Sequence, residues 1–485
     1  MAELKHQVVK ATKWSAITEL IAKLITPITS MVLARLLTPE DFGVMVTAVM
    51  VISFAEIFTD AGFQKYIIQQ PFKSQKSLDE ATNVAFISNL CLSLAIWFII
   101  ILFCEPIAEL VGNKGHGDVI AISCFCIPLS AFSSIQMALY KRALNFKFLF
   151  GVRIIGIFIP LIVTIPLALI THSYWALIIG MIALQLANAI ILTVRSKWKP
   201  KVWYSWMIFK RMFSFSAWSM LETLSIWLTN YCDIFIVGTI LNDYYLGVYR
   251  TSMTTVGQIM GIISTATTSV LYSSLSKVQD DDSQFKRILF RFQKTMSIIL
   301  IPMSVGIFIF RNLVTEILLG SQWYQASWFI GIWGITSGVV IVLSYYCSEV
   351  LRAKGKPKLS TISQLIDLLV LLPVIWYGVH QSFNVLCDLR AATRLILIIP
   401  ILIITYVSVK ISPWKMIYNI RIPVLASCVM GILGYWYVSK YNSIAQEFIG
   451  IVICILVYIF MIMIIPSTRV DMINMKNMIF PHKKD

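Results

Sequence analysis

The sequence predicts an all-α, polytopic membrane protein with about 14 transmembrane helices. Hydrophobic residues make up 58% of the 485-residue chain and charged residues only 13%, and the mean hydropathy is +0.79. A typical soluble domain contains about 25% charged residues. Apolar windows of about 20 residues recur along the whole chain, and each is long enough to cross a bilayer as a helix. Such windows are too long for the strands of a transmembrane barrel, so helices are expected.

The expected spans follow one another with short polar connections. They lie at 13–34, 42–62, 82–103, 119–140, 151–171, 174–194, 214–240, 245–273, 293–311, 326–350, 360–379, 386–408, 418–438 and 446–465. Lys and Arg gather at the N-terminus, in every second loop after it and in the C-terminal tail; the other loops contain only Arg35, Lys114, Arg311 and Lys440. Because cytoplasmic loops retain Lys and Arg, both termini are expected in the cytoplasm. The same rule explains the net charge of +16 without a nucleic-acid partner.

The first outward-facing turn, ARLLTPEDFG at 34–43, carries the signals of a helix start. Thr38 can cap the second helix, and Pro39 suits its first position. Glu40 and Asp41 then lie near the positive end of the helix dipole. Capping alone explains these four residues.

The connection at 195–213 is the longest basic and aromatic loop, with SKWKPKVWYSWMIFKRMF at 196–213. It divides the first six spans from the next six, so we expect a linker that lies at the membrane interface. Two six-helix lobes are common in transporters. The predicted division is an N-terminal lobe, a C-terminal lobe, and helices 13 and 14 with a basic cytoplasmic tail, at 1–200, 201–410 and 411–485.

Ionisable residues inside the spans are functional candidates, because a charge at the membrane centre costs roughly 3 kcal/mol or more. In the first helix Glu19 and Lys23 are four residues apart on one face, and Lys23 lies about 15 Å into the helix. A self-neutralising pair that only packs is the alternative. In the seventh helix Glu222 and Asp233 fall near one stripe. Arg250 begins a polar stripe in the eighth.

Two further sets of charges lie in the later and earlier helices. Arg390 and Arg394 are four residues apart in the twelfth helix and repel each other, so they need an anion from the protein or a ligand. An ordinary outer helix end is the alternative, and Asp367 is a further candidate. Glu56 and Asp60 lie near the inner end of the second helix, where acids oppose the helix dipole. They are interpreted mainly as a structural or gating pair.

The sequence contains no catalytic or metal-binding motif that we recognise. The five His residues show no metal-ligand spacing, and HExxH, GxSxG and GKS or GKT sequences are missing. We therefore expect no enzyme activity, no catalytic residue, no metal and no cofactor. Energy would come from a partner chain or from an ion gradient.

Three segments resemble the bacterial polysaccharide-exporter family, the flippases of O-antigen, colanic-acid and teichuronic-acid type. Residues 33–70 resemble its N-terminal signature, 230–254 its D-x-x-[IL]-[IV]-G…LG-x-Y segment, and 349–363 its L-x-A-x-G-[KR]-x-x-L loop. The resemblance covers roughly residues 10–410. In the first segment the matching residues are Arg35, Pro39, Asp41, Phe42, Gly43, Asp60, Gly62 and Gln69.

The resemblance implies the fold of the multidrug/oligosaccharidyl-lipid/polysaccharide superfamily, with two six-helix lobes around a central V-shaped cavity. It implies alternating access that carries a polyprenyl-pyrophosphate-linked oligosaccharide between leaflets of the bacterial cytoplasmic membrane. Related lipid II flippases bind pyrophosphate through cations of the first and eighth helices, so Lys23 and Arg250 are candidates by helix position. Arg390 and Arg394 complete the expected cationic set.

The same resemblance sets the expected partners. Membrane lipids, the lipid-linked oligosaccharide, a polysaccharide polymerase and a chain-length regulator are the expected partners. The intramembrane acids make H+ or Na+ the candidate coupling ion, and downhill movement without ion coupling is the alternative. The candidates for ion coupling or gating are Glu19, Glu222, Asp233, Asp367, Glu56 and Asp60. A drug or metabolite antiporter of the same superfamily is the main alternative, although its often cationic substrates fit a cationic cavity poorly. A membrane-bound polymerase or ligase would need a long outer loop, and a scaffold would not need intramembrane charges.

Overall fold

Helices form nearly all of the described chain. The computed structural model describes residues 21–60, 62–441 and 443–465, together with Trp14 and Arg469. These ranges contain no strand. The predicted all-α class is therefore confirmed.

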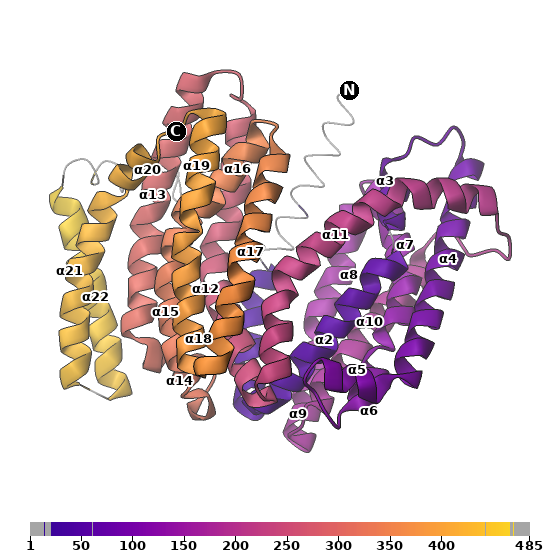
Figure 1. Ribbon diagram of the computed structural model, residues 1–485, viewed down its shortest axis with the longest axis horizontal. Coiled ribbons are helices and arrows are strands. Elements are labelled where there is room, and N and C mark those ends of the chain that lie inside the picture. The colour runs from indigo at the N-terminus through magenta and orange to yellow at the C-terminus, as the bar shows by residue number, and fades with distance from the viewer. Residues whose placement is uncertain (1–13, 15–20, 61, 442, 466–468, 470–485) are drawn as a thin grey trace, which may run out of the picture. The chain divides into compact units, whose positions relative to one another are not determined.

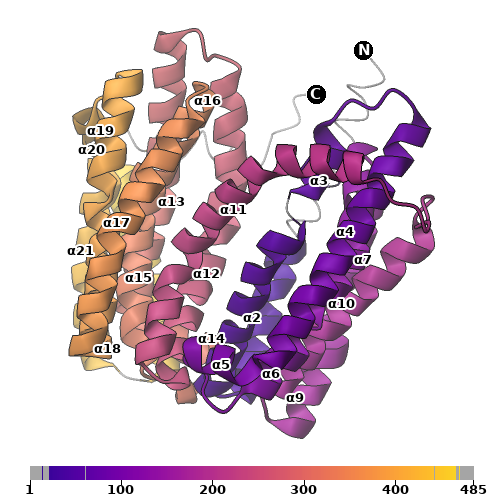
Figure 2. The ribbon, with the colours of Figure 1, turned by 45° about the vertical axis from the view of Figure 1, so that its right-hand side comes forward.

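The first of two compact units comprises residues 1–250. It begins with a helix over 21–36. The helices α2, α4, α7 and α10 then pack side by side (Figures 1 and 2). Gly62 precedes a short helix, α3, whose buried residues Phe63 and Ile67 pack on α4 and α7. The helices are α2 (Pro39–Asp60), α3 (Phe63–Gln69), α4 (Gln75–Leu102), α5 (Cys104–Leu110), α6 (Gly117–Ser123), α7 (Cys126–Arg142), α8 (Phe146–Ile159), α9 (Ile165–Thr171), α10 (Trp175–Arg195), α11 (Trp206–Ile240) and the start of α12 (Asp243–Ser276).

The second unit comprises residues 251–485 and contains the rest of α12. Within it, α13 packs against α15 and α21, and α21 packs against α22 (Figure 1). The Tyr458 hydroxyl donates to the carbonyl of Ile298 at 2.8 Å and ties α22 to α13. The helices are α13 (Asp282–Ile309), α14 (Arg311–Leu318), α15 (Ala326–Val340), α16 (Tyr346–Ala353), α17 (Pro357–Gln381), α18 (Phe383–Ile396), α19 (Ile398–Val409), α20 (Pro413–Asn419), α21 (Arg421–Lys440) and α22 (Ile444–Ile464).

Twelve helices in the described ranges are long and apolar enough to cross a membrane. They correspond to twelve of the expected spans. The first expected span lies partly outside the described residues and is helical over 21–36. The eighth, at 245–273, is helical throughout as part of α12, but it is not among these twelve. The multi-pass architecture is confirmed, while the count of 14 stays a prediction.

Two expected spans contain an irregular turn. Residues Pro160–Thr164 and Ile341–Tyr345 form π-helical turns that join α8 to α9 and α15 to α16. A π-helical turn inserts one residue into the helical repeat and rotates the side chains that follow. Hydropathy does not report such a rotation, which is why the sequence predicted these spans without it.

The predicted start of the second helix is confirmed. The backbone and hydroxyl groups of Thr38 donate to Asp41 Oδ2 at 2.9 and 3.0 Å, and Asp41 N donates back to the Thr38 hydroxyl at 3.4 Å. Pro39 is the first residue of α2. Asp41 does more than cap, because its Oδ1 accepts from the backbone N–H of Tyr174 at 2.8 Å. It thereby fixes the start of α10 against the start of α2.

The predicted linker is held on α4 by a residue that the sequence analysis did not identify. The buried Asn83 side chain donates to the Lys201 carbonyl at 2.7 Å and to the Trp203 carbonyl, and it accepts from Lys201 N at 2.7 Å. Tyr204 bonds to Ser88 at 3.1 Å. The compact units place α11, which follows this linker, with the preceding helices. The division into lobes at residue 200 stays a prediction.

Candidate transport site

A polar cavity of about 380 Å³ lies inside the first unit, and we call it the inner cavity. Two of its lining residues are acids, Glu56 and Asp60 of α2, and none of its described lining residues is a Lys or Arg. The remaining polar groups are hydroxyls and amides, whose oxygen atoms can coordinate a cation. They come from α2, α3, α4, α7, α10 and α11, as Ser53, Thr59, Gln64, Asn89, Ser130, Ser133, Ser134, Gln185 and Thr223.

The two carboxylates lie one helical turn apart on the wall of this cavity. Ser130 of α7 is within hydrogen-bonding reach of Glu56, and Gln64 of α3 is within reach of Asp60. Asp60 Oδ1 is buried and has no hydrogen-bond partner among the described residues. Lys65 and Lys141 act on Asp60 from α3 and from the end of α7 without lining the cavity. Two neighbouring acids on the wall of a cavity whose described lining contains no Lys or Arg favour a proton or a bound cation in this space.

The inner cavity contains polar residues that the sequence analysis missed. Asn89 is buried and donates to Ser134 at 2.8 Å, while it accepts from Ser93 at 3.2 Å. Gln185 and Ser130 reach the same cavity from α10 and α7. Each is an uncharged polar residue inside an apolar span. The sequence analysis selected only ionisable residues inside the spans, so it did not identify these uncharged polar residues.

Asp233 is buried and joins two helices. Its Oδ2 accepts from the Tyr249 hydroxyl of α12 at 3.0 Å. This bond fixes α11 to the first turns of α12 and gives Asp233 a packing function. Glu19 and the side chain of Glu222 lie outside the described residues, so the predicted Glu19–Lys23 pair and the stripe of Glu222 and Asp233 stay predictions.

Arg250 lies at the end of a ladder of aromatic rings. The Trp227 indole stacks on Tyr231 with centroids 5.4 Å apart, and the Arg250 guanidinium lies 5.8 Å from the Tyr231 ring centroid. Phe54 of α2 contacts Trp227 at 4.9 Å, and the Trp227 N–H donates to Ser53 at 3.0 Å. Arg250 is therefore held beside part-exposed aromatic faces. Lys23, the other candidate, is partly buried on the helix over 21–36.

In the second unit the predicted cations of α18 meet α15 and α17. The Arg394 guanidinium lies 3.7 Å from the Trp333 ring centroid and donates to Ser337 at 3.0 Å and Thr336 at 3.2 Å. Arg390 lies 5.3 Å from the same centroid and acts electrostatically on Asp367 of α17. Asp367 is thus an acid close to this pair. These contacts favour a structural function for Arg394.

Replacing Arg394 by glutamine should therefore destabilise the second unit. Charge-assisted bonds contribute about 1.5–3 kcal/mol each, so we expect a loss of roughly 2 kcal/mol in thermal unfolding of the purified protein. Arg421→Gln is the matched control, because Arg421 also lies over a ring, that of Tyr418 at 3.5 Å, but is exposed. An unchanged melting temperature in Arg394→Gln with lost transport would instead indicate that Arg394 binds substrate.

The TPEDFG segment at 38–43 and the LGVY segment at 246–249 meet where α2 and α12 begin. We call this contact the α2–α12 joint. A Cβ atom on Gly247 would overlap the Pro39 carbonyl oxygen, and a Cβ atom on Gly43 would overlap the Asp243 carbonyl oxygen. Both backbones therefore approach each other in a way that only glycine permits. The TPEDFG and LGVY sequences supply these glycines.

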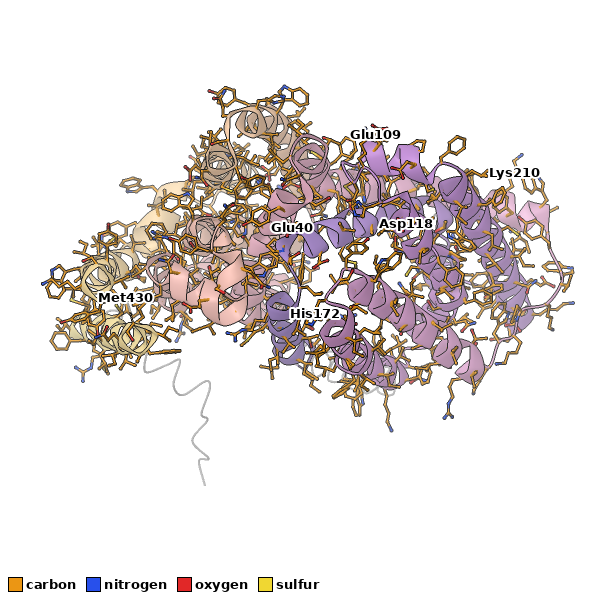
Figure 3. The ribbon with its side chains drawn as sticks, turned by 90° about the horizontal axis from the view of Figure 1, so that it is seen from below. Glu40, Glu109, Asp118, His172, Lys210 and Met430 are labelled. Carbon is orange, nitrogen blue, oxygen red and sulfur yellow. The ribbon has the colours of Figure 1, made fainter. Side chains whose placement is uncertain are left out.

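A loop after α5 closes over the same joint. In the orientation that satisfies its amide, Asn113 donates to the two Asp243 carboxylate oxygens at 2.9 and 3.1 Å and accepts from Thr47 at 2.7 Å. Gly112 has a φ of +85° and lies against the Gly238 backbone. The fully buried Asn113 links α2, α5 and α12. Figure 3 views the molecule from this end, with Glu40 of α2 and Asp118 of α6 labelled.

Comparisons with known proteins agree with this architecture. A family model described as polysaccharide biosynthesis protein matches residues 32–328. An uncharacterized membrane protein in the cps region of Klebsiella pneumoniae is 23% identical over 378 residues, which cover 77% of each chain. The succinoglycan biosynthesis transport protein ExoT of Rhizobium meliloti is 22% identical over 319 residues, 66% of this chain and 64% of ExoT.

Solved structures give the same result at the level of the fold. The lipid II flippase MurJ, in an inward closed conformation, is similar with a TM-score of 0.72 and 15% sequence identity. The similarity covers 93% of this chain and 98% of MurJ. It shows that the two proteins share a fold. Because the family model matches more than half of its residues, the chain belongs to the polysaccharide biosynthesis protein family.

Proposed function

We propose that the protein is a flippase for surface polysaccharide biosynthesis. It moves a polyprenyl-pyrophosphate-linked oligosaccharide from the inner to the outer leaflet of the bacterial cytoplasmic membrane by alternating access. The observation that carries this proposal is the family match over residues 32–328, joined to a fold shared with a lipid II flippase. The succinoglycan transport protein among its relatives supports a saccharide cargo.

The chemistry of the first unit supports an anionic, sugar-bearing headgroup. A pyrophosphate is stabilised by charge-assisted hydrogen bonds from Lys or Arg, and Lys23 and Arg250 are the proposed donors. Sugar rings present C–H faces that pack on aromatic rings. Trp227 and Tyr231 are partly exposed beside Arg250, so they are placed to contact the first sugars next to the pyrophosphate. Only the headgroup needs a polar path, because the lipid tail can stay in the bilayer.

The inner cavity supports ion coupling. Glu56 and Asp60 lie together on the wall of this polar cavity, and Asp60 Oδ1 has no hydrogen-bond partner within the described part of the chain. We infer that this pair binds H+ or Na+ and releases it during the transport cycle. An ion that binds one conformation more tightly than the other shifts the equilibrium between them, which is what a gradient needs to drive transport.

The proposal includes a location and partners. The protein is a multi-pass protein of the bacterial cytoplasmic membrane with both termini in the cytoplasm, as its basic loops predict. It transports and does not catalyse a covalent reaction. A polysaccharide polymerase and a chain-length regulator would consume the flipped repeat units on the outer side.

Substitution of the proposed pyrophosphate donors tests the substrate site. Lys23→Ala and Arg250→Ala should each lower flipping of the lipid-linked saccharide by roughly tenfold, since each removes one charge-assisted contact. The measurement is accessibility of the saccharide to an external lectin in cells that express equal amounts of each variant. Arg153→Ala is the control, because Arg153 is an exposed cation of α8 in the same unit. Normal flipping in both test variants would remove Lys23 and Arg250 from the site.

A further inference from the structure

A second and larger cavity, about 1200 Å³, opens on the side of the first unit. We call it the lateral groove. It lies among the start of α4, the end of α7, the start of α8 and the end of α10. Small-molecule sites usually have volumes of about 300–1,000 Å³, so this groove is large enough for part of a lipid.

One rim of the lateral groove carries three cations, from two helices and the linker that follows the second. Lys147 lies at the start of α8, while Arg195 and Lys197 lie at and beyond the end of α10. All three side chains are exposed, and no hydrogen bond or ion pair engages them within the described part of the chain. A fourth cation, Arg142, is already used, because it donates to the carbonyls of Ile67 at 2.7 Å and Gln70 at 2.8 Å.

Specific side-chain contacts hold together the helix ends that form the groove. Tyr140 stacks on Phe148 with centroids 4.3 Å apart, and its hydroxyl donates to the Arg195 carbonyl at 2.7 Å. These contacts hold the end of α7 against α8 and α10. The acid that lines the groove, Asp79 of α4, already accepts from the Gln75 side chain at 2.8 Å. The cationic rim therefore keeps its charge for a ligand.

Below the cations the wall becomes apolar. Ile155 is 46% exposed, Ile190 53% and Val194 68%. At 1.5 Å per residue, Ile155 lies about 12 Å along α8 from Lys147, and Ile190 about 7.5 Å along α10 from Arg195. The span that contains α8 has the lowest buried share of the twelve, 17%, as expected of a helix that faces lipid. Charge at one end and apolar surface deeper in the membrane match a lipid headgroup above its acyl chains.

We propose that the lateral groove binds an acidic phospholipid of the leaflet on which the basic loops lie. The phosphate contacts Lys147, Arg195 and Lys197, and one acyl chain lies along Ile155 and Ile190. Basic pockets between transmembrane helices on the cytoplasmic side are typical sites for such headgroups. Bound there, the lipid joins the ends of α7, α8 and α10 and stabilises the first unit. This site is separate from the inner cavity and does not depend on the transported substrate.

The test uses the purified full-length protein in a nonionic detergent, with dioleoylphosphatidylglycerol as the probe. Native mass spectrometry should show retained phosphatidylglycerol, and the melting temperature should rise with its concentration but not with phosphatidylcholine. The triple variant Lys147→Gln, Arg195→Gln, Lys197→Gln should weaken this binding by roughly 100-fold. The control Lys277→Gln, Arg287→Gln, Arg291→Gln removes the same charge from exposed positions of the other unit and should bind as the unmodified protein does.

A second variant keeps the test informative if the charge variant fails to fold. Gly151 lines the lateral groove, and a Cβ atom there meets no atom within 4 Å, so Gly151→Leu should fill the groove and displace the lipid. Gly306→Leu, at another open glycine outside the groove, should not. Equal stabilisation by phosphatidylcholine, full binding to Gly151→Leu, or a response to farnesyl pyrophosphate without one to phosphatidylglycerol would each overturn the proposal.

Discussion

Gly247→Ala should destabilise the protein by roughly 3 kcal/mol and reduce transport. A methyl group on Gly247 overlaps the Pro39 carbonyl oxygen and approaches the backbone of Gly43, so no side-chain rotation can relieve the clash. Overpacking costs about 1–3 kcal/mol where side chains can adjust, and backbone cannot adjust so easily. Because the α2–α12 joint connects the start of α2 to the start of α12, the change should separate the two helix ends.

The control lies ten residues further along the same helix. A Cβ atom on Gly257 meets nothing within 4 Å. Glycine inside a helix costs about 0.5–1 kcal/mol relative to alanine, so Gly257→Ala should stabilise the protein slightly. Thermal unfolding of the two variants, measured side by side in detergent, should therefore shift in opposite directions. Equal shifts would show that the close approach at Gly247 does not contribute to stability.

Neutralising the two acids of the inner cavity should abolish ion-driven transport while the protein still folds. Glu56→Gln and Asp60→Asn keep the shape of both side chains and remove two half-buried like charges that lie one helical turn apart, so folding should not suffer. A pair that can no longer exchange H+ or Na+ cannot couple transport to a gradient. We expect at least a tenfold loss of gradient-dependent flipping in proteoliposomes, with unchanged melting temperature.

The matched control neutralises two exposed acids of the same unit. Glu109 and Asp118 lie at the end of the unit where α5 and α6 are found (Figure 3), and Glu109 pairs with Lys114 at 3.2 Å on the surface. Glu109→Gln with Asp118→Asn should leave flipping and its ion dependence unchanged. Gradient-dependent flipping that survives in the Glu56→Gln, Asp60→Asn variant would make this pair structural.

Local chemistry made the helices and their starts predictable. Long apolar windows form helices because backbone N–H and C=O groups in lipid must hydrogen-bond to each other. Twelve of these helices have the expected length and composition. The Thr38, Pro39 and Asp41 cap was predictable because its donors and acceptors lie within four residues of one another. The TPEDFG and LGVY segments could be recognised by their resemblance to a known family, but the sequence did not predict that they contact each other.

Contacts between distant parts of the chain could not be predicted in the same way. Asn83 binds Lys201 across 118 residues, and Arg394 meets Trp333 and Ser337 across more than 50. Neither pairing leaves a periodic signal in one sequence. The inner cavity was half predicted: Glu56 and Asp60 were chosen for their charge, whereas its amides and hydroxyls come from separate helices and carry no charge to reveal them.

The central claim is that this chain flips a lipid-linked saccharide, and deletion of its gene tests it most directly. Lipids extracted from the deletion strain would be analysed by mass spectrometry, together with the surface glycan. The account predicts an accumulated polyprenyl-pyrophosphate repeat unit on the inner leaflet and loss of the glycan, both restored by the intact gene. A normal surface glycan with no accumulated intermediate, in a strain with no second gene of this family, would contradict it.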